Sequence, residues 1–204
     1  MENENNFQLN ANQPASPLRE NEDTLWDSIK EWVQVIIVAL IIALPIRWYV
    51  AEPFIVNGAS MDPTFATGQF LVVDRLTYHF ENPNRGDVIV FEYPNDPSTY
   101  YIKRIIGLPG ETVDIKDGEI TIINKKYPDG IKLNEPYLAN EHLSHDTSTK
   151  TLGQTEYFVL GDNRAQSSDS RFWGPLDKHF IIGRPIVRLM PITKLSLWPG
   201  QESQ

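Results

Sequence analysis

The chain has 204 residues, 41% of them hydrophobic and 22% charged, which is enough for one globular domain with appended segments. Its formal net charge of −9 argues against nucleic acid as a partner, because nucleic-acid-binding surfaces are basic. The sequence contains no cysteine, which excludes disulfides, thiolate chemistry and cysteine-based zinc sites.

Three segments follow one another along the chain. Residues 1–23 are polar and lack an apolar period, which predicts a disordered N-terminal tail. Residues 24–50 predict a short helical lead-in, up to Glu31, followed by a transmembrane anchor helix. Residues 51–204 predict a β-rich domain that carries the chemistry.

The anchor is predicted from the apolar run WVQVIIVALIIALPIRWYV over residues 32–50, close to the ~20 residues that cross a bilayer as a helix. Trp32 and Trp48-Tyr49 at its ends resemble interfacial aromatic anchors, and the charge of Arg47 can reach the headgroups. Two alternatives compete with this interpretation. A cleaved secretory signal would have a shorter apolar core behind a basic leader, whereas this leader is acidic. A buried core helix would show a polar face, and only Gln34 interrupts this run.

After the anchor, short alternating apolar runs between turn residues predict a mainly β fold: a compact antiparallel β domain behind a single transmembrane helix. The Asp117-Gly118 pair predicts a two-residue hairpin. Residues 128–155 are rich in polar and turn-forming residues, which predicts an exposed loop or a partly ordered insertion. The predicted strands are Pro53–Asn57, Phe70–Asp74, Asp87–Phe91, Tyr100–Ile106, Thr112–Ile115, Glu119–Ile123, Glu156–Leu160 and Ile181–Arg188.

A candidate nucleophile, Ser60, follows the first of these strands in the stretch VNGASMDPT. Gly58 and Ala59 leave the backbone open, so that a substrate carbonyl can approach the Ser60 hydroxyl and amide. A serine hydroxyl is a weak nucleophile and needs a base to take its proton.

Histidine is the usual base, but none of the four histidines lies in an apolar or glycine-rich setting that would indicate a pocket. His142-x-x-His145-Asp146 raises the alternative of a metal site. Histidines of a flexible loop are more often solvated, so we expect no metal and no other cofactor.

Lysine is the other possible base, and Lys103 lies in the apolar strand pattern YIKRIIG. Burial disfavours the ammonium form and lowers the pKa of a lysine, which produces the neutral amine that general-base chemistry requires. The strand pattern alone favours a different interpretation, an exposed lysine on an alternating face, because lysines are seldom buried.

A third stretch, Gly161–Pro175, places polar residues between a strand end and an aromatic pair. This pattern indicates either a surface turn or a hydrogen-bonded network that holds a site rigid. The second interpretation predicts that Arg164, Arg171, Asp162 and Asp169 pair with one another.

Together these stretches resemble the type I signal peptidases (peptidase S26 family), membrane-bound Ser-Lys endopeptidases that remove signal peptides from exported proteins. The resemblance covers residues about 32 to 199, from the anchor onward. Four boxes follow the anchor in the family's order, and this agreement overturns the interpretation of Lys103 as an exposed lysine. The matching boxes are Ser60-Met61-x-Pro63-Thr64, Gly86–Phe91, Tyr101–Glu111 and Gly161–Gly174.

The resemblance implies a role for each matching residue. Ser60 would attack the scissile carbonyl, with Lys103 as its general base and the Ser60 backbone N–H as oxyanion donor. Ser167 would hydrogen-bond the lysine amine and orient it. The residues implied to support the site structurally are Asp162, Asp169 and Arg171.

The sequence departs from the family at two places. Some members have a serine at the position of Gly58, and its hydroxyl completes the oxyanion hole. Glycine has no hydroxyl, so we expect another donor there, because losing one such donor costs about 2.7–4 kcal/mol of barrier. Ala165-Gln166 replaces the more frequent Asp-Asn, which changes the local turn and leaves Ser167 in place.

An extended substrate is predicted to add as a strand beside residues 53–58 and 101–104. The resemblance implies small side chains, often alanine, at the first and third positions before the cut. Core packing would explain the candidate pocket residues equally well. Those residues are Phe54, Val56, Met61, Tyr101 and Ile102.

The function implied is a serine endopeptidase held in a plasma or thylakoid-type membrane by a single span, with its catalytic domain on the extracytoplasmic or lumenal side. Its expected partners are signal peptides of exported preproteins and the lipid bilayer. The alternatives are an inactive membrane-tethered adaptor, a Ser-Lys self-cleaving domain and aspartic catalysis by Asp162 and Asp169. The arginines that flank these two carboxylates disfavour the last, because shared-proton catalysis needs one carboxyl to stay protonated.

Overall fold

A computed structural model describes residues 25–45, 50–138 and 144–201. The chain divides into two units, Met1–Ile42 and Ala43–Gln204. Several predictions lie outside the described residues. These are the disordered tail 1–23 with Thr24, the anchors Arg47 and Trp48-Tyr49, and His142.

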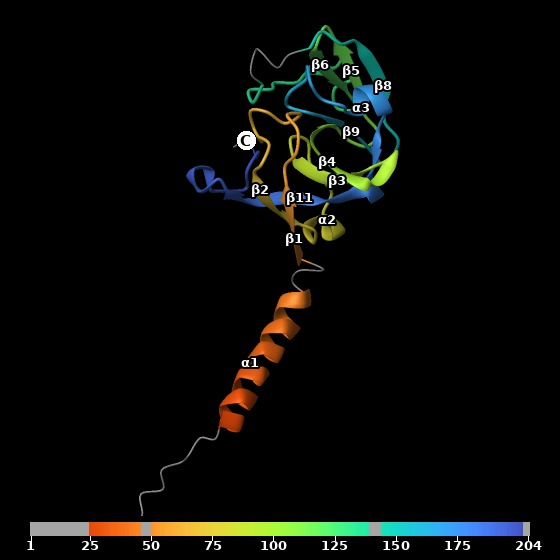
Figure 1. The fold of residues 1–204 in the computed structure, drawn as a ribbon. Coiled ribbons are helices and arrows are strands. Elements are labelled where there is room, and N and C mark those ends of the chain that lie inside the picture. The colour runs from red at the N-terminus through yellow and green to blue at the C-terminus, as the bar shows by residue number, and fades with distance from the viewer. Residues whose placement is uncertain (1–24, 46–49, 139–143, 202–204) are drawn as a thin grey trace, which may run out of the picture. The chain divides into compact units, whose positions relative to one another are not determined.

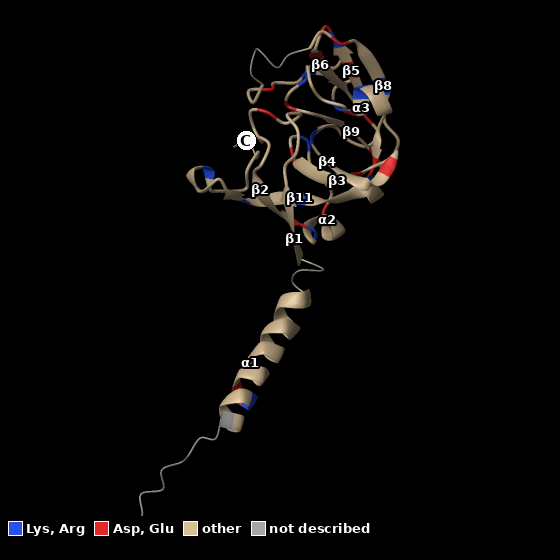
Figure 2. Ribbon diagram, viewed as in Figure 1, with Lys and Arg blue, Asp and Glu red and all other residues tan. Residues whose placement is uncertain are grey.

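A single long helix, α1, spans Leu25–Pro45 (Figure 1). Within the described residues, the predicted lead-in and the predicted span form one continuous helix, up to Pro45. Its charged residues are confined to its N-terminal part, as Figure 2 shows. Residues 28–45 have a mean hydropathy of 1.8 and none of them is buried, which disagrees with a buried core helix. By length and composition, α1 is a candidate membrane span.

The second unit is built from two antiparallel sheets (Figure 1). The larger sheet has the strand order β1-β2-β11-β3-β4-β9-β10, and β12 pairs with β11 outside this path. Strand β4 is 12 residues long and lies between β3 and β9. It pairs with β3 over most of its length and with β9 only at its C-terminal end, from Arg104 to Gly107. The strands are β1 Ala51–Ile55, β2 Phe70–Asp74, β3 Val88–Tyr93, β4 Asp96–Gly107, β9 Glu156–Leu160, β10 Leu176–Asp177, β11 Ile181–Met190 and β12 Ser196–Leu197.

The smaller sheet has the order β7-β6-β5-β8, and its strands are β5 Thr112–Lys116, β6 Glu119–Ile123, β7 Ile131–Lys132 and β8 Ser148–Thr151. The hairpin between β5 and β6 turns at Asp117-Gly118 as predicted, with positive φ at both residues. Residues 128–155, predicted to be an exposed loop or a partly ordered insertion, contain the short strands β7 and β8. Strand β8 pairs with β5 over four residues, so this polar segment is an edge of the sheet.

All eight predicted strands are present, and β2, β6 and β9 have the predicted bounds. Short helical turns complete the unit: α2 Thr77–Phe80, α3 Ser170–Trp173, and the 3-10 turns η3 Lys178–Phe180 and η4 Ile192–Lys194. The fold class is therefore as predicted, mainly antiparallel β with one N-terminal apolar helix.

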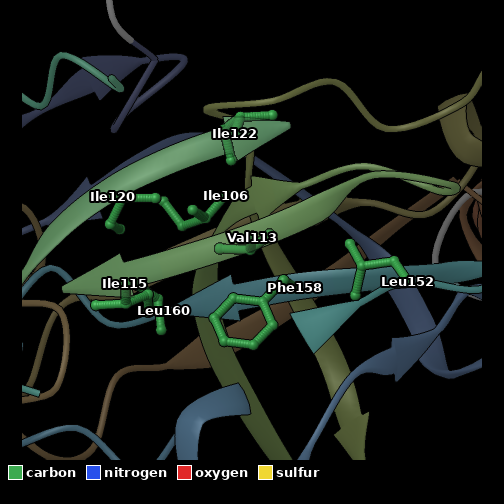
Figure 3. Packing of buried hydrophobic residues seen from close by; sticks show 8 residues of the cluster. All are labelled: Ile106, Val113, Ile115, Ile120, Ile122, Leu152, Phe158 and Leu160. Atoms are coloured by element: carbon green, nitrogen blue, oxygen red, sulfur yellow. The ribbon is translucent and has the colours of Figure 1, made fainter. Parts of the chain in front are cut away.

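Buried apolar side chains form three clusters in the second unit. One fills the space between the small sheet and strands β4 and β9 (Figure 3). The second packs β3, β4 and β9 against residues that follow β9. The third contains Val56, Met61, Phe65, Leu71 and Val88, and it lies beneath the turn that carries Ser60. The last two clusters fix the two segments from which the candidate site is built.

Candidate active site

Ser60 lies in the turn between β1 and β2, and that turn is held at both ends. Met61 and Phe65 on its inner side are buried, with 1% and 0% of their surface exposed. Gly58 on the outer side has φ +104°, a conformation that favours glycine. The Thr67 hydroxyl accepts from the Gly58 N–H at 3.1 Å and donates to the Gly58 carbonyl at 3.0 Å. The Gly58 N–H is therefore already hydrogen-bonded to the Thr67 hydroxyl.

Lys103 lies in the middle of β4, opposite Ile89 of β3, and only 3% of it is exposed. Its Nζ is 2.8 Å from Ser60 Oγ and 3.0 Å from the carbonyl oxygen of Ile102. The Tyr101 ring lies 5.0 Å from the same nitrogen. The expectation of an exposed lysine on an alternating face is wrong, and the two residues that the sequence analysis joined lie in direct contact.

Burial lowers the pKa of Lys103 to about 8, because the protein interior solvates the ammonium form poorly. The charges of Asp169 and Asp162 act in the opposite direction and offset part of this effect. An amine with this pKa is largely neutral just above pH 8, and a neutral amine can take a proton from the serine hydroxyl.

Asp162 links the serine turn to β4. It forms a fully buried ion pair with Arg104, with Nε–Oδ1 and Nη2–Oδ2 distances of 2.9 Å and 2.6 Å. The Thr64 hydroxyl donates to the same carboxylate at 2.5 Å. Buried charges are stable when they are paired and fully hydrogen-bonded, as this pair is. Asp162 thus pairs with Arg104, and not with Arg164 or Arg171 as predicted.

Asp169 and Arg171 pair with each other, as predicted. The Nε–Oδ1 and Nη2–Oδ2 distances are both 2.8 Å, and Asp169 also accepts from the Gly161 N–H at 3.1 Å. Arg164 differs from the prediction, because its guanidinium pairs with Glu135, 29 residues earlier in the chain. Asp162 and Asp169 each pair with a different arginine, whereas aspartic catalysis needs two carboxyl groups that share one proton.

Ser167 is buried close to the serine turn, but its Oγ makes no hydrogen bond within the described part of the chain. Its predicted bond to the lysine amine is therefore not formed in this structure. Gly161 lies between the two segments: a Cβ atom on it would come within 2.3 Å of both Ser167 Oγ and Ser60 O. The Asn163 N–H donates to Ser60 O at 3.0 Å, so this loop packs directly on the backbone of Ser60.

A groove of about 290 Å³ opens above Ser60 and Lys103. Four of the five predicted pocket residues line it: Phe54, Val56, Tyr101 and Ile102. The fifth prediction, Met61, is wrong, because that side chain lies in the third apolar cluster beneath the turn.

The sequence analysis missed other lining residues, among them Leu71, Tyr100 and Gln166. Tyr100 packs edge-on against Phe54 with ring centres 5.3 Å apart, which joins β4 to β1 across the groove. Tyr100 could have been predicted to line the groove, because it lies two residues before Ile102 on the same strand and residues i and i+2 share a face.

The Ser60 N–H meets no hydrogen-bond acceptor among the residues that the structure describes, which leaves it available to a substrate oxygen. A hydroxyl in contact with a buried amine, beneath an apolar groove in a β domain, is the layout of a serine peptidase. The same class emerges from comparison with known proteins.

The chain belongs to the signal peptidase family, peptidase S26, whose profile matches residues 29–190. It is 38% identical to the "Probable signal peptidase I-1" of Synechocystis sp., over 83% of this chain and 86% of that protein. It is 37% identical to the signal peptidase I of Leptolyngbya laminosa, over 90% and 88% of the two chains. A crystal structure of a signal peptidase I from Enterococcus faecalis is 32% identical, with a TM-score of 0.43, covering 51% of this chain and 97% of that one.

Proposed function

We propose that this protein is a membrane-bound serine endopeptidase that cleaves N-terminal signal peptides from exported preproteins. The observation that carries the proposal is the 2.8 Å contact between Ser60 Oγ and the Nζ of a buried Lys103. Membership of the signal peptidase family, and the names of the relatives, support the choice of signal peptides as substrates.

In the proposed reaction, neutral Lys103 takes the Ser60 proton while Oγ attacks the scissile carbonyl carbon. The negative charge on the carbonyl oxygen is stabilised by the Ser60 N–H. Lys103 then passes its proton to the leaving amine, and the C–N bond breaks to give an ester on Ser60. A water molecule, deprotonated by the same amine, hydrolyses this ester and restores the enzyme.

The remaining polar residues have supporting roles in this proposal. Ser167 would orient the lysine amine after a rotation of its hydroxyl, because that group is buried nearby with no other partner within the described residues. Asp162, Asp169 and Arg171 would hold the surrounding loop through their ion pairs. No cofactor has a role in this chemistry.

The substrate would bind as an extended strand along the groove, between residues 53–58 and 101–104. Backbone hydrogen bonds would fix its register, and alternate side chains would point into the groove. Phe54, Val56 and Ile102 narrow this space, which fits small side chains such as alanine at the first and third positions before the cut.

Helix α1 would be a single-pass anchor in the lipid bilayer, within an N-terminal segment of residues 24–50 that follows the tail 1–23. The peptidase domain, residues 51–204, would act on the extracytoplasmic or lumenal face of a plasma or thylakoid-type membrane. Limited proteolysis of sealed vesicles tests this topology: the domain is cleaved from outside only if it faces outward.

The direct test is cleavage of a preprotein by the full chain in detergent, compared with Ser60→Ala. We expect the wild type to release the mature protein and the variant to release none above background. Cleavage by Ser60→Ala at the wild-type rate would contradict the nucleophile. An uncut substrate with both proteins would favour the inactive adaptor, and cleavage of the chain itself in its place would favour a self-cleaving domain.

A further inference from the structure

A short segment after β7, Glu135-Pro136-Tyr137, contacts both Arg164 and Arg104. The Glu135 carboxylate accepts two hydrogen bonds from Arg164 and a third, at 2.6 Å, from the Tyr137 hydroxyl. The ring of Tyr137 stacks on Arg104, with its centre 4.0 Å from the guanidinium carbon. The segment thus bridges β4 and the loop after β9.

These contacts are buried. The side chains of Arg164 and Glu135 are 4% and 9% exposed. Burial alone would lower the pKa of Arg164, but the hydrogen bond and charge of Glu135 outweigh it and raise that pKa. Removing the carboxylate would leave a buried guanidinium without its counter-charge, which is far more disruptive than the loss of a surface pair.

The position of Arg164 is transmitted to Ser60 through two backbone contacts. Arg164 Nε donates to the Gly161 carbonyl at 3.1 Å, and Gly161 has no room for a Cβ between Ser60 O and Ser167 Oγ. Two residues further on, the Asn163 N–H holds Ser60 O at 3.0 Å. A shift of this loop therefore moves the serine turn directly.

Tyr137, at the other end of the segment, acts on β4, the strand that carries Lys103. Arg104 follows Lys103 on β4, and its ion pair with Asp162 joins β4 to the same loop. The Tyr137 ring covers the face of this guanidinium, where a cation–π contact restricts its movement. Neither Glu135 nor Tyr137 is among the residues that line the groove, so neither contacts a substrate bound there.

From these contacts we infer that Glu135 and Tyr137 are positioning residues, which set the contact between Ser60 and Lys103 through Arg164 and Arg104. The inference rests on the proposed function. It assigns a role in the reaction to a segment that lies in the connection between β7 and β8, away from the groove.

The test is Glu135→Gln in the full chain in detergent, with a synthetic peptide that carries alanine at the first and third positions before the cut. We expect kcat to fall about 10- to 100-fold, because small misplacements of reacting groups are costly, with KM changed less than about twofold. Tyr137→Phe removes one hydrogen bond and keeps the ring, so its kcat should fall about threefold. Glu119→Gln is the matched control, because its partner Lys132 is 64% exposed and kcat should not change.

Two further measurements separate positioning from loss of fold. Near-UV circular dichroism at the assay temperature identifies variants whose tertiary packing is intact. The double variant Glu135→Gln/Arg164→Gln should lose no more kcat than the worse single variant, because both changes break one connection. Losses that multiply, or a folded Glu135→Gln with wild-type kcat, would overturn the inference.

If Glu135→Gln does not fold, Tyr137→Phe decides: a folded variant with wild-type kcat overturns the inference, and a reduced kcat at unchanged KM supports it. A wild type no more active than Ser60→Ala would instead overturn the proposed function, which separates the two failures.

Discussion

Strand β4 carries two consecutive cationic residues, and both are buried: Lys103 is 3% exposed and Arg104 is 1% exposed. Successive residues of a strand point to opposite faces, so their side chains reach different surroundings. Arg104 forms a two-point ion pair with Asp162 and donates to the carbonyls of Gly86 and Gly200. Lys103 meets one hydroxyl and one carbonyl, and no ion pair found among the described residues includes it.

The difference shows that burial of a cation has two outcomes. A charge that is removed from water remains if a carboxylate compensates it, as Asp162 does for Arg104. Without such a partner the neutral form is favoured, and the pKa falls, as it does at Lys103. One strand therefore supplies a permanent cation for structure and, at the preceding position, an amine that can accept a proton.

The largest effect is expected when Lys103 is replaced by arginine, the residue type of its neighbour Arg104. In Lys103→Arg the guanidinium stays protonated at every pH of interest and cannot accept the Ser60 proton. We expect kcat/KM for a preprotein to fall about 10²- to 10⁴-fold, which is the range for loss of a general base. Lys103→Met, which removes the base without adding a charge, should lose as much. Activity of Lys103→Arg within about tenfold of wild type would refute a base at this position.

Removal of the Asp162 carboxylate, the partner of Arg104, should lower the stability of the protein. Asp162→Asn leaves a buried guanidinium unpaired and should lower the free energy of unfolding by about 3–5 kcal/mol. Denaturant unfolding of the whole chain in detergent, followed by tryptophan fluorescence, measures this change. Glu119→Gln, in an exposed pair with Lys132, should change it by less than about 1 kcal/mol. A loss equally small for Asp162→Asn would show that the buried pair is dispensable.

The pH dependence of cleavage follows from the same difference. In the proposed mechanism the neutral form of Lys103 is the active one, so activity should be full well above its pKa of about 8 and be lost as the pH falls through that value. Well below it, kcat/KM should fall about tenfold per pH unit, which amounts to roughly 50-fold between pH 8 and pH 6. Initial rates in a constant-ionic-strength buffer series measure the profile. A rate that stays level down to pH 5 would exclude this amine as the base.

A smaller effect is expected at the serine turn. Thr67→Val removes both hydrogen bonds to Gly58 and keeps the side-chain shape. Exposed hydrogen bonds of this kind are each worth about 0.5–1.5 kcal/mol, so kcat should fall about three- to tenfold. Thr99→Val is a control, because among the described residues its hydroxyl donates to Asp96 at the start of β4. Equal kcat values for both variants would mean that Thr67 does not hold the turn.

Local pattern predicts much of this fold. Alternating apolar residues define β2 and β6, because each of these strands buries every second side chain, whereas β9 is a continuous apolar run that is buried on both faces. The Asp117-Gly118 hairpin is equally local, because two positive φ angles favour that pair. Strand β8, with the sequence Ser-Thr-Lys-Thr, has no such pattern. It is a strand because β5 offers it an unpaired edge, which its own residues do not reveal.

In the site, too, the local sequence predicts some features and only the fold determines the others. The residues around Ser60 indicate a nucleophile, but those around Lys103 favour an exposed lysine, and only the resemblance of all the stretches to one family predicted it as the base. The distance between the two residues depends on how β4 packs beneath the serine turn. The partners of the arginines were the least predictable part. Charge alone allows Arg164 to pair with any acid near it in sequence, whereas the fold brings Glu135 to it from the connection after β7. Met61 was misassigned because an apolar side chain beside a nucleophile can face either the groove or the core.

The protonation state of the Lys103 amine can be measured without a substrate. NMR titration of the full chain in detergent, with ¹³C-labelled lysine, follows each Cε signal, and the spectrum of Lys103→Met assigns the one from Lys103. We expect its midpoint at about pH 8, well below the ordinary lysine value of 10.5. A midpoint at 10.5 would mean that burial leaves the amine as basic as an ordinary lysine, with less than roughly one molecule in a thousand neutral at pH 7, and would contradict Lys103 as the base for Ser60.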